Sequence, residues 1–214
     1  YTKTFYWTMT QGRRGMLWDV KNRKKIGVIA GGQRIDRPQF TRDASLLFVS
    51  LRDRGGSIQG FRTTDGKQAT KLIPIENRVN RPYYVHEPRK GVRRIVAVNF
   101  NNGTFNLWDA DSGKTIGAEL TASEKSGLVD INVSSDDRFI GAAYGDGTLS
   151  LWSSEDGKLV YQTKVPGGPV YFSGGRRNYM VVTATSGRMF GWVDVSAESI
   201  EVKMEETAFR IDDV

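Results

Sequence analysis

The sequence predicts an all-β chain made of about five four-stranded antiparallel repeats. An aromatic residue closes a short strand and leads into a polar turn at five places, Trp18, Phe61, Trp108, Trp152 and Trp192. The intervals of 43, 47, 44 and 40 residues match the period of a β-propeller blade. Glycine recurs five residues before four of these aromatics, at Gly56, Gly103, Gly147 and Gly187. No segment shows a sustained helical apolar stripe, so the fold class is β-propeller.

The clearest repeat predicts each of its four strands in turn. Apolar residues predict a first strand over Val129–Val133 and a second over Phe139–Tyr144, with a polar turn between them. Alternating apolar and polar residues predict a half-buried third strand over Thr148–Trp152. An outer strand follows at Leu159–Gln162. These strands form an antiparallel meander.

The other repeats follow the same order. Their second strands are predicted at Phe48–Leu51, Ile95–Phe100 and Met180–Ala184. Tight turns need residues that accept positive φ angles. Four dipeptides supply them: Asp65-Gly66, Asn102-Gly103, Asp146-Gly147 and Asp156-Gly157.

These repeats resemble the WD40 family, in which the third strand of a blade ends in Trp-Asp. Trp18-Asp19 and Trp108-Asp109 match that dipeptide, and the other three repeats keep only the aromatic. The stretch Thr41–Ser50, followed by Gly66-Lys67, also resembles propeller repeats of the YVTN and cytochrome d1 type. The first resemblance implies an interaction scaffold. The second implies a bacterial, often periplasmic kinship with heme-binding members, although no histidine or cysteine here is placed to ligate a heme.

The ends of the chain are offset by one strand. The first repeat begins at its second strand, Thr4–Met9, whereas Arg210-Ile211-Asp212 enters a new repeat after Trp192. In one arrangement the C-terminal segment completes the first blade and closes a five-bladed ring. In the favoured arrangement, residues 1–214 are part of a larger, seven-bladed propeller whose further blades come from the same or another chain. In both, the whole chain belongs to a single propeller domain.

Composition limits the kinds of site that the chain can carry. It has no cysteine, which excludes a disulfide framework and a thiolate metal site. No stretch approaches the roughly 20 apolar residues that cross a membrane. We predict no membrane span, no metal and no cofactor. Composition leaves the compartment open, with a cytoplasmic or nuclear location slightly favoured over a periplasmic one.

Charge is distributed unevenly along the chain. Residues 1–94 hold 21 Lys or Arg and 7 Asp or Glu, whereas residues 95–214 hold 10 and 17. Arginine pairs bidentately with carboxylate and phosphate, so clustered arginines suit an acidic or phosphorylated protein partner. Eight arginines map to loops that share one face of a propeller and form the predicted partner-binding set: Arg13, Arg14, Arg34, Arg37, Arg52, Arg54, Arg78 and Arg81.

The basic residues also have explanations that involve the structure of the blades alone. The repeated Arg-x-x-Arg-Pro pattern is also explained as a device of the blade, with local pairs such as Arg34 with Asp36. Two further basic runs are typical of solvated turns. They comprise Lys21, Arg23, Lys24 and Lys25, and Arg89, Lys90, Arg93 and Arg94.

No catalytic constellation is present in the sequence. The single histidine, His86, follows an inner strand and is predicted to cap a turn. We therefore predict a non-enzymatic WD40-like scaffold that binds other proteins. The alternatives are an RNA- or DNA-backbone-binding component of a ribonucleoprotein assembly, and a YVTN-type propeller enzyme or cofactor carrier.

Overall fold

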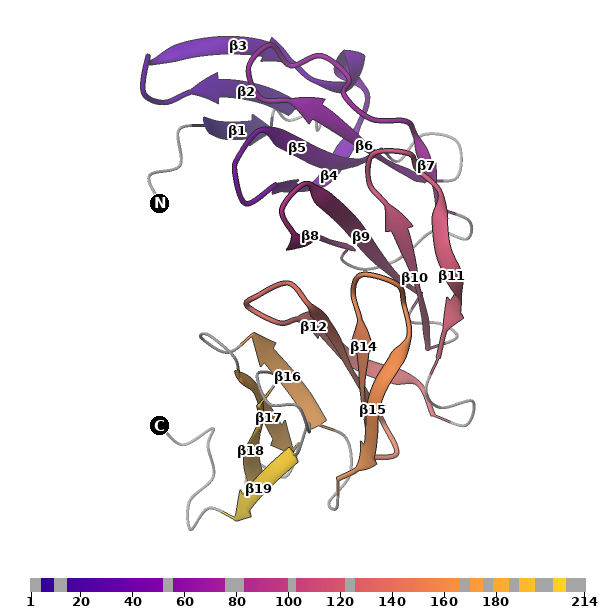
Figure 1. The fold of residues 1–214 in the computed structure, drawn as a ribbon. Coiled ribbons are helices and arrows are strands. Elements are labelled where there is room, and N and C mark those ends of the chain that lie inside the picture. The colour runs from indigo at the N-terminus through magenta and orange to yellow at the C-terminus, as the bar shows by residue number, and fades with distance from the viewer. Residues whose placement is uncertain are drawn as a thin grey trace. The chain divides into compact units, whose positions relative to one another are not determined.

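The computed structural model describes residues 5–9, 15–51, 56–75, 83–99, 103–121, 126–165, 170–174, 179–184, 189–194 and 202–206 (Figure 1). These residues form strands β1 to β19 and one 3₁₀ turn, η1 (Ala30–Gly32), with no α-helix among them. No helix in this part of the chain is long and apolar enough to cross a membrane.

The strands build five sheets, each a meander in sequence order. The first sheet has three strands, β1 (Phe5–Met9), β2 (Gly15–Asp19) and β3 (Lys24–Val28). The second contains β4 (Ile35–Phe40), β5 (Leu46–Leu51), β6 (Ser57–Arg62) and β7 (Ile73–Pro74). The third contains β8 (Tyr83–Arg89), β9 (Val92–Asn99), β10 (Thr104–Asp109) and β11 (Thr115–Leu120).

The last two sheets have the same form. The fourth contains β12 (Leu128–Val133), β13 (Phe139–Tyr144), β14 (Thr148–Ser153) and β15 (Leu159–Lys164). The fifth contains β16 (Val170–Gly174), β17 (Tyr179–Ala184), β18 (Met189–Asp194) and β19 (Val202–Glu206). Their neighbouring strands pair antiparallel. The predicted all-β, four-stranded repeat is thus confirmed.

The chain divides into two compact units, which are described separately. The first unit comprises Tyr1–Glu87, Arg93–Ala97 and Trp108–Thr115. The second comprises Pro88–Val92, Val98–Leu107 and Ile116–Val214. The assignment of residues 1–214 to one propeller domain stays a prediction.

The core of the first unit lies on both faces of β5. Phe48 is fully buried in a cluster with Ile58 and Trp108. Its neighbour Leu47 is fully buried in a second cluster, with Phe61. Successive residues of a strand point to opposite faces, so a continuous apolar strand suits this position between two cores.

The core of the second unit contains large aromatic side chains. Tyr144 and Phe105 are fully buried, and Trp152 is 7% exposed. The rings of Phe105 and Trp152 meet edge to face, with centroids 5.8 Å apart and an interplanar angle of 87°. Edge-to-face packing is a favoured geometry for aromatic pairs. The repeated aromatics that mark the sequence therefore serve packing where their side chains are described.

Polar turns join the strands with recurrent hydrogen bonds. Thr41 Oγ1 donates to Asp43 Oδ1 at 2.6 Å and accepts from Leu46 N at 3.1 Å. Ser134 and Asp136 repeat the first of these bonds in the fourth sheet, also at 2.6 Å. At Gly103 both the backbone conformation and the available space favour glycine, because φ is 72° and a Cβ atom would lie 3.1 Å from Leu128 N. These turns hold the blades at fixed register.

Candidate functional site

The structure describes two of the eight arginines predicted to bind a partner. Arg34 is exposed and directly precedes β4, in the loop where the sequence places it. Arg37 differs from the prediction because it lies inside β4, half-buried, rather than in a loop. The remaining six lie outside the described residues: Arg13, Arg14, Arg52, Arg54, Arg78 and Arg81.

Arg37 occupies a β-bulge. The pairing of β4 with β5 shifts register between Asp36 and Gln39, and Arg37 has a φ of 48°. Its backbone N donates to Asp36 Oδ1 at 3.1 Å. A bulge places an extra residue in one strand and bends it. Arg37 therefore lies within β4 even though its backbone conformation is one that is more usual in a turn. The predicted pair of Arg34 with Asp36 does not form, and Arg34 has no ion pair within the described part of the chain.

The basic run at residues 89–94 is largely neutralised by ion pairs. Arg93 Nη2 lies 2.7 Å from Asp111 Oδ1, and Arg94 Nη1 lies 2.7 Å from Asp109 Oδ2. In the second unit, Arg89 Nη2 lies 2.8 Å from Glu155 Oε1. Three of these four cations therefore already form an ion pair with a carboxylate.

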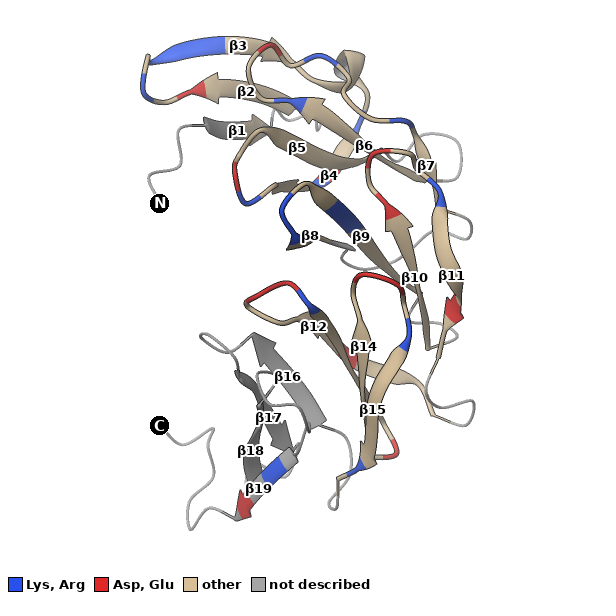
Figure 2. Ribbon diagram, viewed as in Figure 1, with Lys and Arg blue, Asp and Glu red and all other residues tan. Residues whose placement is uncertain are grey.

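The basic run at residues 21–25 has a different environment. Lys21, Arg23, Lys24 and Lys25 are all exposed, at the tip of the β2–β3 hairpin and the start of β3 (Figure 2). The adjacent carboxylate of Asp19 accepts from Asn22 N at 3.0 Å and from Asn22 Nδ2 at 2.7 Å. These bonds from Asn22 are the main cause that lowers the pKa of Asp19. No ion pair to the four cations forms among the described residues.

The β2–β3 turn can be compared with the same turn in the next three sheets. In those three, a glycine N–H at the fifth turn position donates to the first carbonyl at 2.9 Å. These glycines, Gly66, Gly113 and Gly157, have φ angles of 70°, 70° and 73°. Arg23 stands at the corresponding position of the first sheet, with a φ of 51°. The first turn therefore places an arginine where its three sister turns place glycine.

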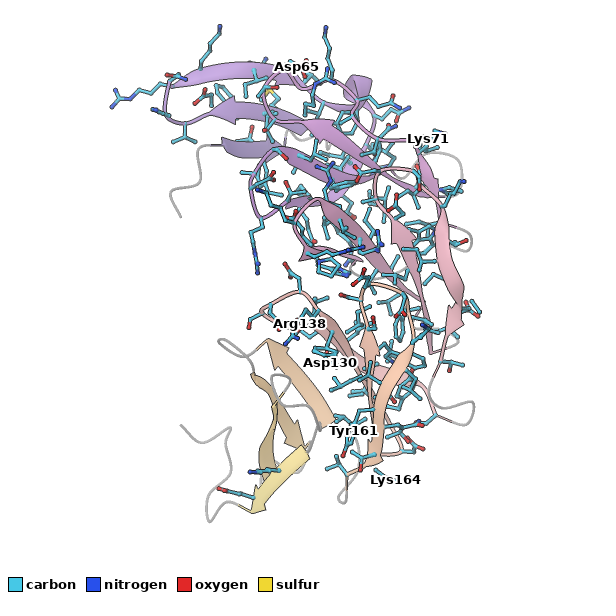
Figure 3. The ribbon with its side chains drawn as sticks, in the orientation of Figure 1. Asp65, Lys71, Asp130, Arg138, Tyr161 and Lys164 are labelled. Carbon is cyan, nitrogen blue, oxygen red and sulfur yellow. The ribbon has the colours of Figure 1, made fainter. Side chains whose placement is uncertain are left out.

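Charge compensation also separates these turns. In the second sheet, Arg62 Nη2 lies 2.8 Å from Asp65 Oδ2, and Asp65 is seen in the turn beside β3 (Figure 3). In the fourth sheet, Lys158 Nζ lies 2.9 Å from Asp156 Oδ2. The third-sheet turn carries Asp109 and Asp111, which hold the two arginines of β9. Of the four described turns, the β2–β3 turn alone presents a cation cluster without paired carboxylates.

Acid is expected to weaken the pairing in the fourth-sheet turn. Hydrogen bonding from the Lys158 side chain is the first cause that lowers the pKa of Asp156 to about 2. Because this pKa lies below the usual value of about 3.9, the stabilisation is complete above pH 4 and is lost as the pH falls through about 2. Asp156→Asn should lower the urea midpoint at neutral pH but approach wild type near pH 2. A gap that is constant across this range would contradict the assignment.

The structure corrects the placement of His86. The sequence predicts a turn cap, but His86 lies inside β8 and is 4% exposed. The burial of a strand residue depends on how the strand packs in the folded chain, and the local sequence around His86 does not specify that packing. Among the described residues, no group of His, Cys, Asp or Glu could hold a metal ion.

Local sequence does not show that the Lys21–Lys25 run differs from the basic run at residues 89–94, because the ion pairs of the second run join residues that are distant in sequence. Glu155 lies 66 positions from Arg89, so local sequence gives no sign that it compensates this cation. The unusual residue at position 23 can, however, be seen in the sequence when the repeats are aligned on their aromatic residues. Glycine follows Phe61, Trp108 and Trp152 by five residues, whereas arginine follows Trp18 and alanine follows Trp192 at that distance.

Comparison with known proteins identifies the fold. By sequence, the chain matches no protein-family profile and no curated protein. By structure, it resembles the β-propeller domain of Cps50 (Swd1) from Myceliophteria thermophila, with a TM-score of 0.66 and 15% identity, over 95% of this chain and 68% of that chain. It also resembles the computationally designed Ika8 protein, with a TM-score of 0.67 and 13% identity, over 97% of this chain and 60% of that chain. The chain therefore has the β-propeller fold predicted from its repeats.

Proposed function

We propose that the chain is a non-enzymatic, WD40-like scaffold for protein–protein interaction. Support comes from the propeller fold, the Trp-Asp dipeptides at Trp18 and Trp108, and buried strands that hold loops in fixed positions. Binding residues often lie on loops that a rigid sheet framework positions. Membership of the WD40 family is itself part of what we propose.

The proposed partner is an acidic or phosphorylated protein segment bound by the arginine-rich loop face. The observation that carries this proposal is the exposed side chain of Arg34, which has no ion pair among the described residues. An available guanidinium can form two parallel hydrogen bonds with a carboxylate or phosphate. The surrounding sequence adds to this attraction, since residues 1–94 carry 21 basic and 7 acidic side chains.

An array of acidic, phosphorylated and neutral peptides tests this proposal. The wild-type chain should retain acidic and phosphorylated peptides, and combined Arg34→Ala, Arg78→Ala and Arg81→Ala should weaken that binding at least tenfold. A charge-matched control replaces three cations that already hold carboxylates, through Arg62→Ala, Arg138→Ala and Lys158→Ala. An equal loss of peptide binding in both variants, or no preference of the wild-type chain for acidic and phosphorylated peptides, would contradict the proposal.

A further inference from the structure

The β2–β3 hairpin concentrates positive charge within a short, well-anchored element. Asp19 and Lys24 are Cα partners across the hairpin, as are Trp18 and Lys25. The four cations therefore occupy the turn and the first two residues of β3. Side chains of successive strand residues point to opposite faces, so Lys24 and Lys25 extend the charge to both faces of the hairpin.

The base of the hairpin is held by packing and a hydrogen bond. Leu17 is fully buried, and Trp18 Nε1 donates to Thr8 Oγ1 at 2.9 Å. The second-sheet turn approaches β3, since a Cβ atom at Gly66 would lie 3.9 Å from Ile26 Cγ2. Lys67, the next residue of that turn, is exposed. The basic tip is thus displayed on a fixed support with another cation in the neighbouring turn.

Arg23 distinguishes the tip from the corresponding turns of the next three sheets. A left-handed backbone is unfavourable for residues with a Cβ atom and suits glycine. Three sister turns use glycine at this position, whereas the first turn keeps Arg23 at a φ of 51°. The charged side chain of Arg23 is thus kept at a turn position that favours glycine, although positive φ angles also occur at Ala30, Ala44 and Asp137.

The chemistry of the tip favours phosphates over a protein surface. Aromatic anchors, which dominate many protein interfaces, are absent between Asp19 and Lys25, where Val20 is the only apolar residue and Arg23 the only arginine. Lysine, the residue type of the other three cations, is depleted at protein interfaces. Three of the four cations are lysines, which bind phosphate as point charges. Nucleic-acid backbones bind such charges through release of condensed counterions, without an apolar anchor.

We propose that the β2–β3 hairpin binds the phosphate backbone of a nucleic acid through Lys21, Arg23, Lys24 and Lys25. The contact is independent of base sequence, because phosphate contacts do not read the edges of the bases. The turn between Asp19 and Lys25 also contains no aromatic side chain on which a base could stack. It is also independent of the arginine-rich loop face, whose residues are different. Four phosphate contacts correspond to a slope of about −3.6 in log K against log salt.

Fluorescence anisotropy with a labelled DNA duplex of arbitrary sequence tests this assignment. From about 50 to 200 mM salt, the affinity of the wild-type chain should fall by about 100-fold. Replacing all four cations with Gln should weaken binding at least tenfold at the lower salt concentration and remove most of the salt slope. A second duplex of unrelated sequence should bind equally well.

A matched control removes the same charge from positions that hold carboxylates. It combines Arg62→Gln, Arg89→Gln, Arg138→Gln and Lys158→Gln. This variant should keep an affinity within about threefold of wild type, with the slope unchanged. Equal weakening by the hairpin and control variants would show that net charge alone drives binding and would overturn the proposal.

Arg23→Gly separates binding from folding. It should raise the melting temperature, because glycine accepts the left-handed backbone, and reduce the salt slope by about 0.9. Reduced binding together with unchanged or higher stability supports the site. Duplex binding equal to wild type would contradict it.

Competition with a poly-glutamate chain distinguishes a nucleic acid from an acidic protein segment as the ligand of the hairpin. Competition by poly-glutamate as strong as by unlabelled duplex would assign the hairpin to an acidic protein segment and overturn the nucleic-acid proposal. The loop-face variant with Arg34, Arg78 and Arg81 replaced by Ala should keep duplex binding through the hairpin. Failure of the peptide-array experiment is therefore distinguishable from failure at this site.

Discussion

Phe105→Ala is expected to lower the free energy of unfolding by about 3–5 kcal/mol, the range for removal of a buried aromatic ring. Phe105 is fully buried on β10, and its ring meets Trp152 edge to face at 5.8 Å. The truncation removes this contact and leaves a cavity that the surrounding strands can fill only in part. Urea denaturation at neutral pH, followed by tryptophan fluorescence and circular dichroism, measures the change.

Asn106→Ala serves as a control in the same strand. Asn106 is half-buried next to Phe105, and its side chain makes one long hydrogen bond of 3.5 Å to Glu119. We expect a change of about 0.5 kcal/mol or less for this replacement. A loss below about 1 kcal/mol for Phe105→Ala would show that the ring is not packed as described.

Gly60→Ala is expected to destabilise the first unit by about 1–3 kcal/mol through overpacking. A Cβ atom at Gly60 would lie 2.8 Å from Phe48 Cε1 and 2.9 Å from Thr70 Cγ2. Phe48 is fully buried, and Thr70 Oγ1 accepts from Gly60 N at 2.9 Å. Neither neighbour can move away without losing contacts. The midpoint of urea unfolding measures the effect.

Gly27→Ala is the matched control for Gly60→Ala. Gly27 also lies in a strand, β3, but a Cβ atom there would meet nothing within 4 Å. Its replacement should be neutral or stabilising by up to about 1 kcal/mol, because alanine restricts the unfolded chain. Phe48→Leu in the Gly60→Ala background should recover part of the loss, since contacting residues couple in double-mutant cycles. Equal stability of both single variants would contradict the predicted clash.

The strands were predictable because their signals are local. The apolar run that predicts a second strand over Phe139–Tyr144 reproduces the bounds of β13. The alternation that predicts the third strand over Thr148–Trp152 gives β14 one residue too short. The glycines of the predicted turns have positive φ angles, including 83° at Gly147. Each of these features depends on neighbours within a few residues.

The position of a residue within the packed sheets was harder to predict. His86 is buried inside β8 although its neighbours suggest a turn, and Arg37 occupies a bulge inside β4. A bulge depends on register with the partner strand, which the sequence of one strand does not specify. These two corrections therefore concern pairing and burial, not the existence of the strands.

The sequence by itself determined the repeat, the strand order and the excess of positive charge in residues 1–94, because spacing and composition are properties of the chain. The tertiary structure decided which cations remain available to a partner. Arg89 is held by Glu155, and Arg93 by Asp111, whereas the tip of the β2–β3 hairpin is exposed. Ion pairs require side chains to meet within a few ångströms, and folding brings together residues that are far apart in the sequence.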